Sequence, residues 1–182
     1  MYTVSTPSNI NDYPVMIAEV LTQIKQDTGQ VEVSSEIEDV IKDATDLIGK
    51  MVGFDIVPTT YSMPFQEFSG STVLVRKGNL KTFTSATDSG GTSYGYERIV
   101  TPNIRIPDKF TVEFSSSISA DPLTLNFTCG WDKDDVPRGL RRVILMKCSD
   151  IYTEERSSYN FGGIKYSDVI ERTLSMYRNI YR

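Results

Sequence analysis

The spacing of the apolar residues changes twice along this chain, and that order constrains the fold more than any other feature. Apolar residues recur at intervals of three and four over Tyr13–Ile24 and again over Ile37–Met51, which is the period of an amphipathic helix. We therefore expect one helix over Asp12–Thr28. We expect a second to begin at Ser34 or Ser35, where the sequence has the spacing of a capping box.

The middle of the chain has the pattern of β-strands. Helical spacing is absent from Asp55 to Cys129, and Gly, Pro, Ser and Thr separate short alternating runs. Ser71–Arg76 and Leu80–Thr84 flank a tight turn, which predicts a hairpin. Phe110–Phe114 and Leu123–Cys129 also alternate, whereas the Gly- and Ser-rich residues 88–95 predict a mobile loop.

Helical spacing returns in the last third of the chain. Aspartates followed by Val136 and Pro137 predict a helix start, and a final helix is expected to begin at Lys165 or Ser167. The predicted fold class is α+β and mainly helical, with about four helices, two N-terminal and two C-terminal, around an inserted small antiparallel β-module. A length of 182 residues fits one domain, which we divide into N-terminal helices (1–54), β-module (55–130) and C-terminal helices (131–182).

The composition argues against most catalytic and metal sites. The chain has no histidine and only two cysteines, which removes the usual general base, the common nucleophile pairs and imidazole ligation of a metal. We predict no catalytic residue, no cofactor and no metal. Hydrolysis by a carboxylate pair stays an alternative, although no spacing here suggests such a pair. Neither a signal peptide nor a membrane span is recognisable, so we expect synthesis in the cytoplasm and no membrane contact.

Charge is distributed unevenly along the chain. Residues 138–182 hold nine Lys and Arg against five Asp and Glu, a balance of +4. Because the net charge of the whole chain is −5, residues 1–137 carry a net charge of −9. This asymmetry indicates head-to-tail packing between copies or contact with an acidic partner, with a chance imbalance on a solvated helix as the alternative. Arg138, Arg141 and Arg142 form a basic cluster at a predicted helix start. The cluster suits a salt-bridged subunit interface or contact with phosphates, and a DNA-binding or regulatory module is the second hypothesis.

Several short motifs follow one another in the C-terminal third. They are Cys129-Gly130-Trp131 after an alternating strand, Val136-Pro137, Arg141–Ile144, a helix end with Tyr152 and Glu155-Arg156, and a closing Leu174, Tyr177 and Arg178. This order resembles the head–tail connector (adaptor, or head-completion) subunits of tailed bacteriophages. The resemblance is specific over Leu123–Arg182 and covers the rest of the chain in outline.

The resemblance implies a structural role at the head–tail junction of the virion. Such subunits form a ring, commonly a dodecamer, which docks on the portal protein, extends the channel for genomic DNA and provides a platform for tail or neck proteins. A tail-terminator or head-completion role in another layer is an alternative within this family. For portal or neighbour docking we select Tyr177, Arg178, Ile180, Tyr181 and Arg182, because exposed aromatic and arginine side chains dominate protein interfaces. For Tyr177, completion of the core is the competing interpretation.

Overall fold

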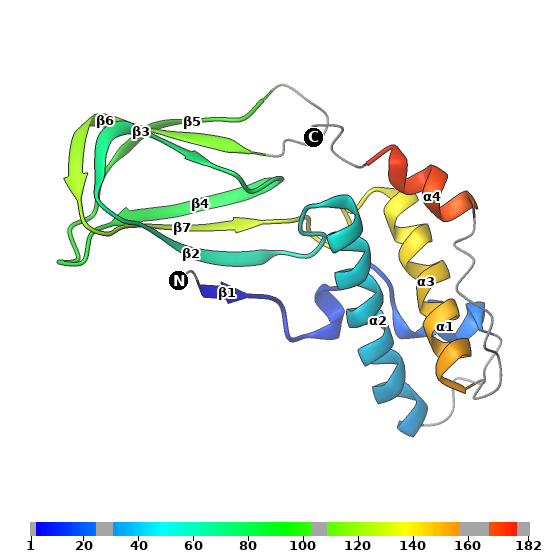
Figure 1. Cartoon of the computed structure of the whole chain (residues 1–182). Helices are drawn as coiled ribbons and strands as arrows, with labels where there is room; N and C mark the ends of the chain where they lie inside the picture. The colour runs from blue at the N-terminus through cyan, green and yellow to red at the C-terminus, as the bar shows by residue number, and fades with distance from the viewer. Residues whose placement is uncertain (1–2, 25–30, 103–108, 157–167, 178–182) are drawn as a thin grey trace. The chain divides into compact units, whose positions relative to one another are not determined.

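The alternating middle of the chain folds into strands, and the sequence on either side of it folds into helices. The computed structural model describes residues 3–24, 31–102, 109–156 and 168–177 (Figure 1). The chain divides into two compact units. The β-unit comprises Met1–Thr6 and Pro58–Trp131, and the helical unit comprises Pro7–Val57 and Asp132–Arg182.

The described residues of the β-unit form two antiparallel sheets. Their strands are β1 (Thr3–Ser5), β2 (Thr59–Phe65), β3 (Phe68–Val75), β4 (Leu80–Thr87), β5 (Tyr96–Val100), β6 (Phe110–Ala120) and β7 (Leu123–Cys129). The strand order is β1-β2-β7-β4 in one sheet and β3-β6-β5 in the other. Consecutive strands such as β6 and β7 therefore belong to different sheets, which the chain joins by crossing between them.

Apolar side chains from both sheets form one core in the β-unit. Along β7, every second residue over Leu123–Cys129 is buried, because successive side chains of a strand point to opposite faces. The ring of Phe127 packs against Tyr61 of the same sheet at 5.3 Å between centroids. It also packs edge-on against Phe110 of the other sheet at 5.2 Å. These aromatic contacts hold the two sheets together.

The helical unit is built from helices near both ends of the chain. They are the 3-10 turn η1 (Ile10–Asp12), α1 (Ile17–Gln23), α2 (Val31–Val52), α3 (Arg138–Arg156) and α4 (Asp168–Ser175). Helices α2 and α3 lie side by side (Figure 1). Val40, Ile41 and Ala44 of α2 are buried, as are Val143 and Ile144 of α3. The predicted apolar stripes are therefore the faces that these helices bury.

The prediction of a mainly helical fold is wrong. Among the described residues, the strands of two antiparallel sheets are nearly as extensive as the helices. Alternation was the only strand signal, and it is weak where strands are polar or exposed. Every residue of β5 except Ile99 is exposed, and β6 continues through Ser115–Ser117, which carry no apolar side chain. The pattern of β2 is interrupted by Pro64.

The predicted hairpin between Ser71–Arg76 and Leu80–Thr84 is also wrong. β3 pairs with β6 and β4 pairs with β7, so the two segments lie in different sheets. Partner choice follows the burial of β6 and β7, which local turn chemistry does not reveal. The segment 88–95 is an ordered turn, because the Asp88 carboxylate accepts hydrogen bonds from Gly90 N, Thr92 N and the Tyr94 hydroxyl at 2.8–2.9 Å.

The helix boundaries differ from those predicted. Helix α1 covers Ile17–Gln23 only, and α2 begins at Val31, so Ser35 lies inside a helix that it was expected to cap. We expected the β-module to cover residues 55–130. In the structure the corresponding part of the β-unit runs from Pro58 to Trp131. That the whole chain acts as one connector domain stays a prediction.

Candidate protein interface at the start of α3

Helix α3 begins with a concentration of positive charge. Arg138, Arg141 and Arg142 lie in its first turns, and no acidic residue lies in the first turn. The unpaired N–H groups at a helix start carry partial positive charge, so a cation there is disfavoured by roughly 0.3–1 kcal/mol. An acidic residue would stabilise this position better, so these arginines do not stabilise α3 through the helix dipole.

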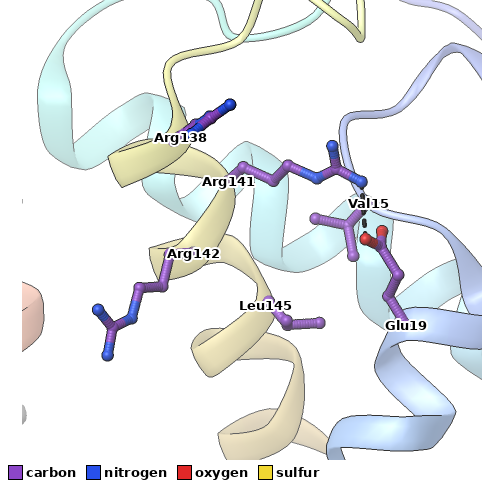
Figure 2. A pocket seen from close by; sticks show the side chains of 6 residues that line it. All are labelled: Val15, Glu19, Arg138, Arg141, Arg142 and Leu145. Carbon is purple, nitrogen blue, oxygen red and sulfur yellow. Dashed lines mark hydrogen bonds and ion pairs between the residues drawn. The ribbon is translucent and has the colours of Figure 1, made fainter.

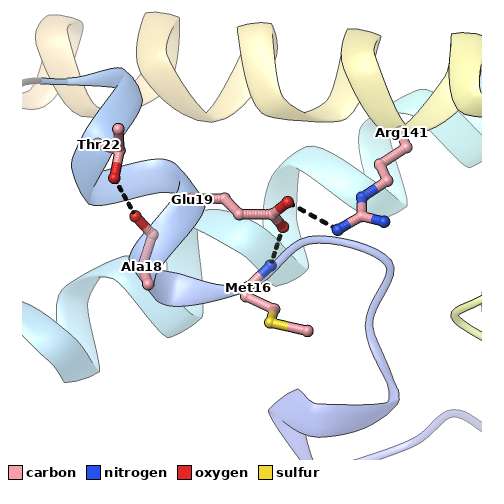
Figure 3. A network of polar contacts seen from close by, with 5 residues as sticks. All are labelled: Met16, Ala18, Glu19, Thr22 and Arg141. Carbon is pink, nitrogen blue, oxygen red and sulfur yellow. Dashed lines mark hydrogen bonds and ion pairs between the residues drawn. The ribbon is translucent and has the colours of Figure 1, made fainter.

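Arg141 is engaged inside the helical unit. Its Nη2 atom lies 2.7 Å from the Glu19 carboxylate of α1. The other carboxylate oxygen of Glu19 accepts a hydrogen bond of 2.9 Å from the backbone N–H of Met16, which caps α1 (Figure 3). Desolvation opposes ionisation of Glu19, but the hydrogen bonds from Arg141 and Met16 outweigh it and lower the pKa of the carboxyl. Arg141 therefore joins α3 to α1.

Arg138 and Arg142 are left for other contacts. Both are exposed, and neither forms an ion pair within the described ranges. With Val15, Glu19, Arg141 and Leu145 they line an open hollow of about 200 Å³ (Figure 2). Leu145 and the almost fully buried Val15 are its apolar lining, and the Glu19 carboxylate lies among the three arginines, so the lining is positive on balance. A negatively charged group with an apolar neighbour fits such a surface.

The ring of Tyr177 packs against Gly139, which lies between these arginines in the sequence. A Cβ atom on Gly139 would lie 2.7 Å from the Tyr177 hydroxyl and 3.1 Å from its Cε2 atom. Tyr177 is only 9% exposed, so its ring occupies the core position that was the competing interpretation. Tyr177 thus brings the end of α4 to the start of α3, where the second predicted site lies.

The remaining docking residues, Arg178, Ile180, Tyr181 and Arg182, lie outside the described residues. Their proposed role is therefore still a prediction. Of the predicted docking residues only Tyr177 is described, and its ring packs against Gly139 in the arginine cluster.

Sequence reasoning missed Glu19 and Gly139. Glu19 and Arg141 are 122 positions apart, and a single sequence offers no signal for such a pair. A signal for Gly139 was present, because glycine in the first turn of an amphipathic helix costs stability relative to alanine. Such a glycine indicates that another group approaches the helix closely.

Other kinds of site were also sought. In the described part of the chain, no three Cys, Asp or Glu side chains are grouped so that they could hold a metal ion. No helix there is both long and apolar enough to cross a membrane.

No family model matches the chain, and no curated protein matches it. Its fold is nevertheless similar to that of chains in solved structures of virus-like particles. One similar structure is a chain in the neck of an empty gene transfer agent (GTA) particle computed with C6 symmetry, with a TM-score of 0.73 and 13% identity over 100% of this chain and 97% of that one. Another is in the neck of a native GTA particle computed with C12 symmetry, with a TM-score of 0.71 and 14% identity over the same shares.

A third similar chain is in the virion of the native GTA particle. Its TM-score is 0.68 at 12% identity, and the match covers 99% of this chain and 97% of that one. At identities this low, the structural similarity shows a common fold and nothing more specific. The resemblance to head–tail connector subunits is therefore confirmed at the level of the fold.

Proposed function

We propose that this chain is a structural virion protein located in the neck, at the head–tail junction. The observation that carries the proposal is the match along the whole length of both chains to neck proteins, with 100% of this chain and 97% of the other aligned. A match over part of the chain would fit a common module used in many contexts, whereas a whole-chain match fits a common architecture. The role is mechanical and needs no catalytic site.

The chain acts as one copy in an oligomeric ring that extends the DNA channel. The neck structures that share its fold were computed with C6 and C12 symmetry. Cyclic symmetry requires each copy to offer two different, complementary surfaces. The positive start of α3 and the negative balance of the remaining sequence supply surfaces of opposite charge.

We assign the portal contact to the C-terminal residues Arg178, Ile180, Tyr181 and Arg182. Tyr177 anchors this segment to α3 and is itself buried. Tyrosine and arginine are the residue types that contribute most to protein interfaces. On the opposite side of the ring, a downstream neck or tail protein binds.

The DNA-binding alternative is less well supported. Of the three arginines, Arg141 is neutralised by Glu19. The chain as a whole carries a net charge of −5, which does not suit a dedicated DNA-binding protein. We therefore assign Arg138 and Arg142 to a protein contact, while DNA passes through the ring without sequence recognition.

Co-purification with the portal protein of the same particle tests the proposal. The full chain should be retained by immobilised portal assemblies. A variant ending at Tyr177 keeps the core contact with Gly139, so it should melt at a similar temperature but be lost from the portal. Retention of the truncated chain would refute the C-terminal docking. Failure of the full chain to bind would refute the portal contact altogether.

A further inference from the structure

We propose that Arg138 and Arg142 of one copy form ion pairs with the acidic face of α2, centred on Asp43, of the next copy in the ring. This inference rests on the proposed function, because it requires copies of the chain to assemble cyclically. It specifies which surfaces meet and involves only the helical unit of each copy.

The basic surface consists of Arg138 and Arg142, whose positive charges are exposed. Arg138 and Arg142 lie four positions apart in α3, so they share one side of the helix. Both are exposed, and neither pairs with another residue that the structure describes. Figure 2 shows the Arg142 side chain extending from α3 away from Val15 and Glu19, so its charge is presented to the surroundings.

The acidic surface lies on α2. Asp39, Asp43 and Asp46 are exposed and spaced by four and three residues, so they form one stripe along the helix. Lys42 pairs with Asp39 and Lys50 pairs with Asp46. Asp43, between them, has no ion pair within the described residues. It is the carboxylate in the stripe that is available for a second molecule.

The segment of α2 that carries this stripe is negative as a whole. Between Ser35 and Lys50 it holds five Asp and Glu against two Lys, a balance of −3. Arg138 and Arg142 add two positive charges at the start of α3, where Glu19 already neutralises Arg141. The two surfaces therefore complement each other in charge.

The two surfaces belong to different sides of the helical unit. The buried face of α2, which includes Ile37, Ile41 and Ile48, packs in the core with α3. Asp43 lies two positions from Ile41, roughly 160° around the helix from it. The acidic stripe consequently faces away from α3, and it is not available to the arginines of the same copy. Surfaces on different sides generate a head-to-tail contact that can close into a ring.

A second copy is the occupant that we assign to the arginine surface. Its α2 offers Asp43, an exposed carboxylate that forms no ion pair with the described residues. In an assembly of identical copies, an acidic helix stripe is present at every interface by symmetry. The pairing therefore requires no protein other than copies of this chain.

Two charge-reversed variants of the full chain test this pairing. In the first, Arg138→Glu and Arg142→Glu make the basic surface acidic. In the second, Asp39→Lys and Asp43→Lys make the acidic stripe basic. Ring formation is measured by native mass spectrometry and negative-stain microscopy, with the portal protein present if the wild type requires it. Arg172→Glu, which reverses an exposed cation of α4, is the control.

Each charge-reversed variant alone should form rings at least about tenfold less than the wild type, because like charges then meet at every interface. An equal mixture should restore rings that alternate the two variants, since each reversed surface then faces its complement. Thermal melting verifies that both variants are folded. The control should assemble like the wild type.

Other outcomes separate this inference from the proposed function. Rings that form equally well from each variant alone, or a mixture of folded variants that fails to recover, overturn the pairing and leave the neck assignment standing. Rings that form but lose salt-sensitive retention of DNA would assign the arginines to DNA and also overturn it. A wild type that stays monomeric beside its portal overturns the proposed ring and the pairing together.

Discussion

The hydroxyl of Tyr177 lies 2.7 Å from the point where a Cβ atom on Gly139 would stand. The last described residue of the chain thereby fits against the first turn of α3, and only glycine leaves room for the ring. This contact joins the residues at the end of α4 to the start of α3. It also makes the packing of α4 sensitive to a single methyl group at position 139.

Gly139→Ala should destabilise the protein. Alanine favours a helix by about 1 kcal/mol over glycine, but here the added methyl group forces the buried ring to move, which typically costs about 1–3 kcal/mol. The cost should be smaller in a Tyr177→Phe background, which lacks the closest atom. Urea denaturation of the four proteins in this double-mutant cycle measures the coupling.

Gly95→Ala is the control for that cycle, because nothing lies within 4 Å of the point where its Cβ atom would stand. It should leave the free energy of unfolding nearly unchanged. If Gly139→Ala costs as much free energy of unfolding in the Tyr177→Phe background as with the native tyrosine, or costs none in either, the contact does not constrain α4.

Glu19→Gln should weaken the attachment of α1 to α3. The pKa of Glu19 is lowered in the folded state, so the ionised carboxyl stabilises the fold above its ordinary pKa of 4.5. That stabilisation is lost as the pH falls through the lowered pKa. Because both partners are more than a third exposed, we expect a loss of only about 0.5–1 kcal/mol at neutral pH.

The pH dependence distinguishes this role from general destabilisation. The difference between Glu19→Gln and wild type should be present at neutral pH and should shrink once the solution is acidic enough to protonate Glu19. Glu97→Gln, at an exposed position of β5, is the matched control and should show little difference. A Glu19→Gln defect of equal size at all pH values would refute the ion-pair explanation.

Cys148 should be unreactive in the folded protein. Burial raises the pKa of its thiol to about 12, and only the thiolate attacks alkylating reagents readily. Cys129 is buried as well. Mass spectrometry after iodoacetamide treatment at mildly alkaline pH should find both cysteines unmodified in buffer and modified in denaturant. Rapid alkylation of Cys148 in buffer would show that α2 and α3 separate readily.

Parts of this fold follow from local sequence, and parts depend on contacts that local sequence does not encode. β7 was predicted at its observed bounds, Leu123–Cys129, because one face is buried throughout and the alternation is complete. β5 was missed because both of its faces are largely exposed. The pairing of β3 with β6 was missed because partner choice depends on the burial of whole sheets.

The candidate site divides in the same way. The basic cluster at the start of α3 was visible in the sequence as three arginines after a helix-start signal. The withdrawal of Arg141 into an ion pair with Glu19 was not, because the residues are 122 positions apart. Nor did the sequence decide between core and docking for Tyr177. That required the position of Gly139.

The location of the chain in the assembled particle tests the central claim most directly. Gold-labelled antibody against this chain would be imaged by electron microscopy on particles from cells that carry its gene. We predict a single labelled position per particle, at the junction of head and tail. Label distributed over the head shell or along the tail, or complete particles that lack the chain, would contradict its assignment to the neck.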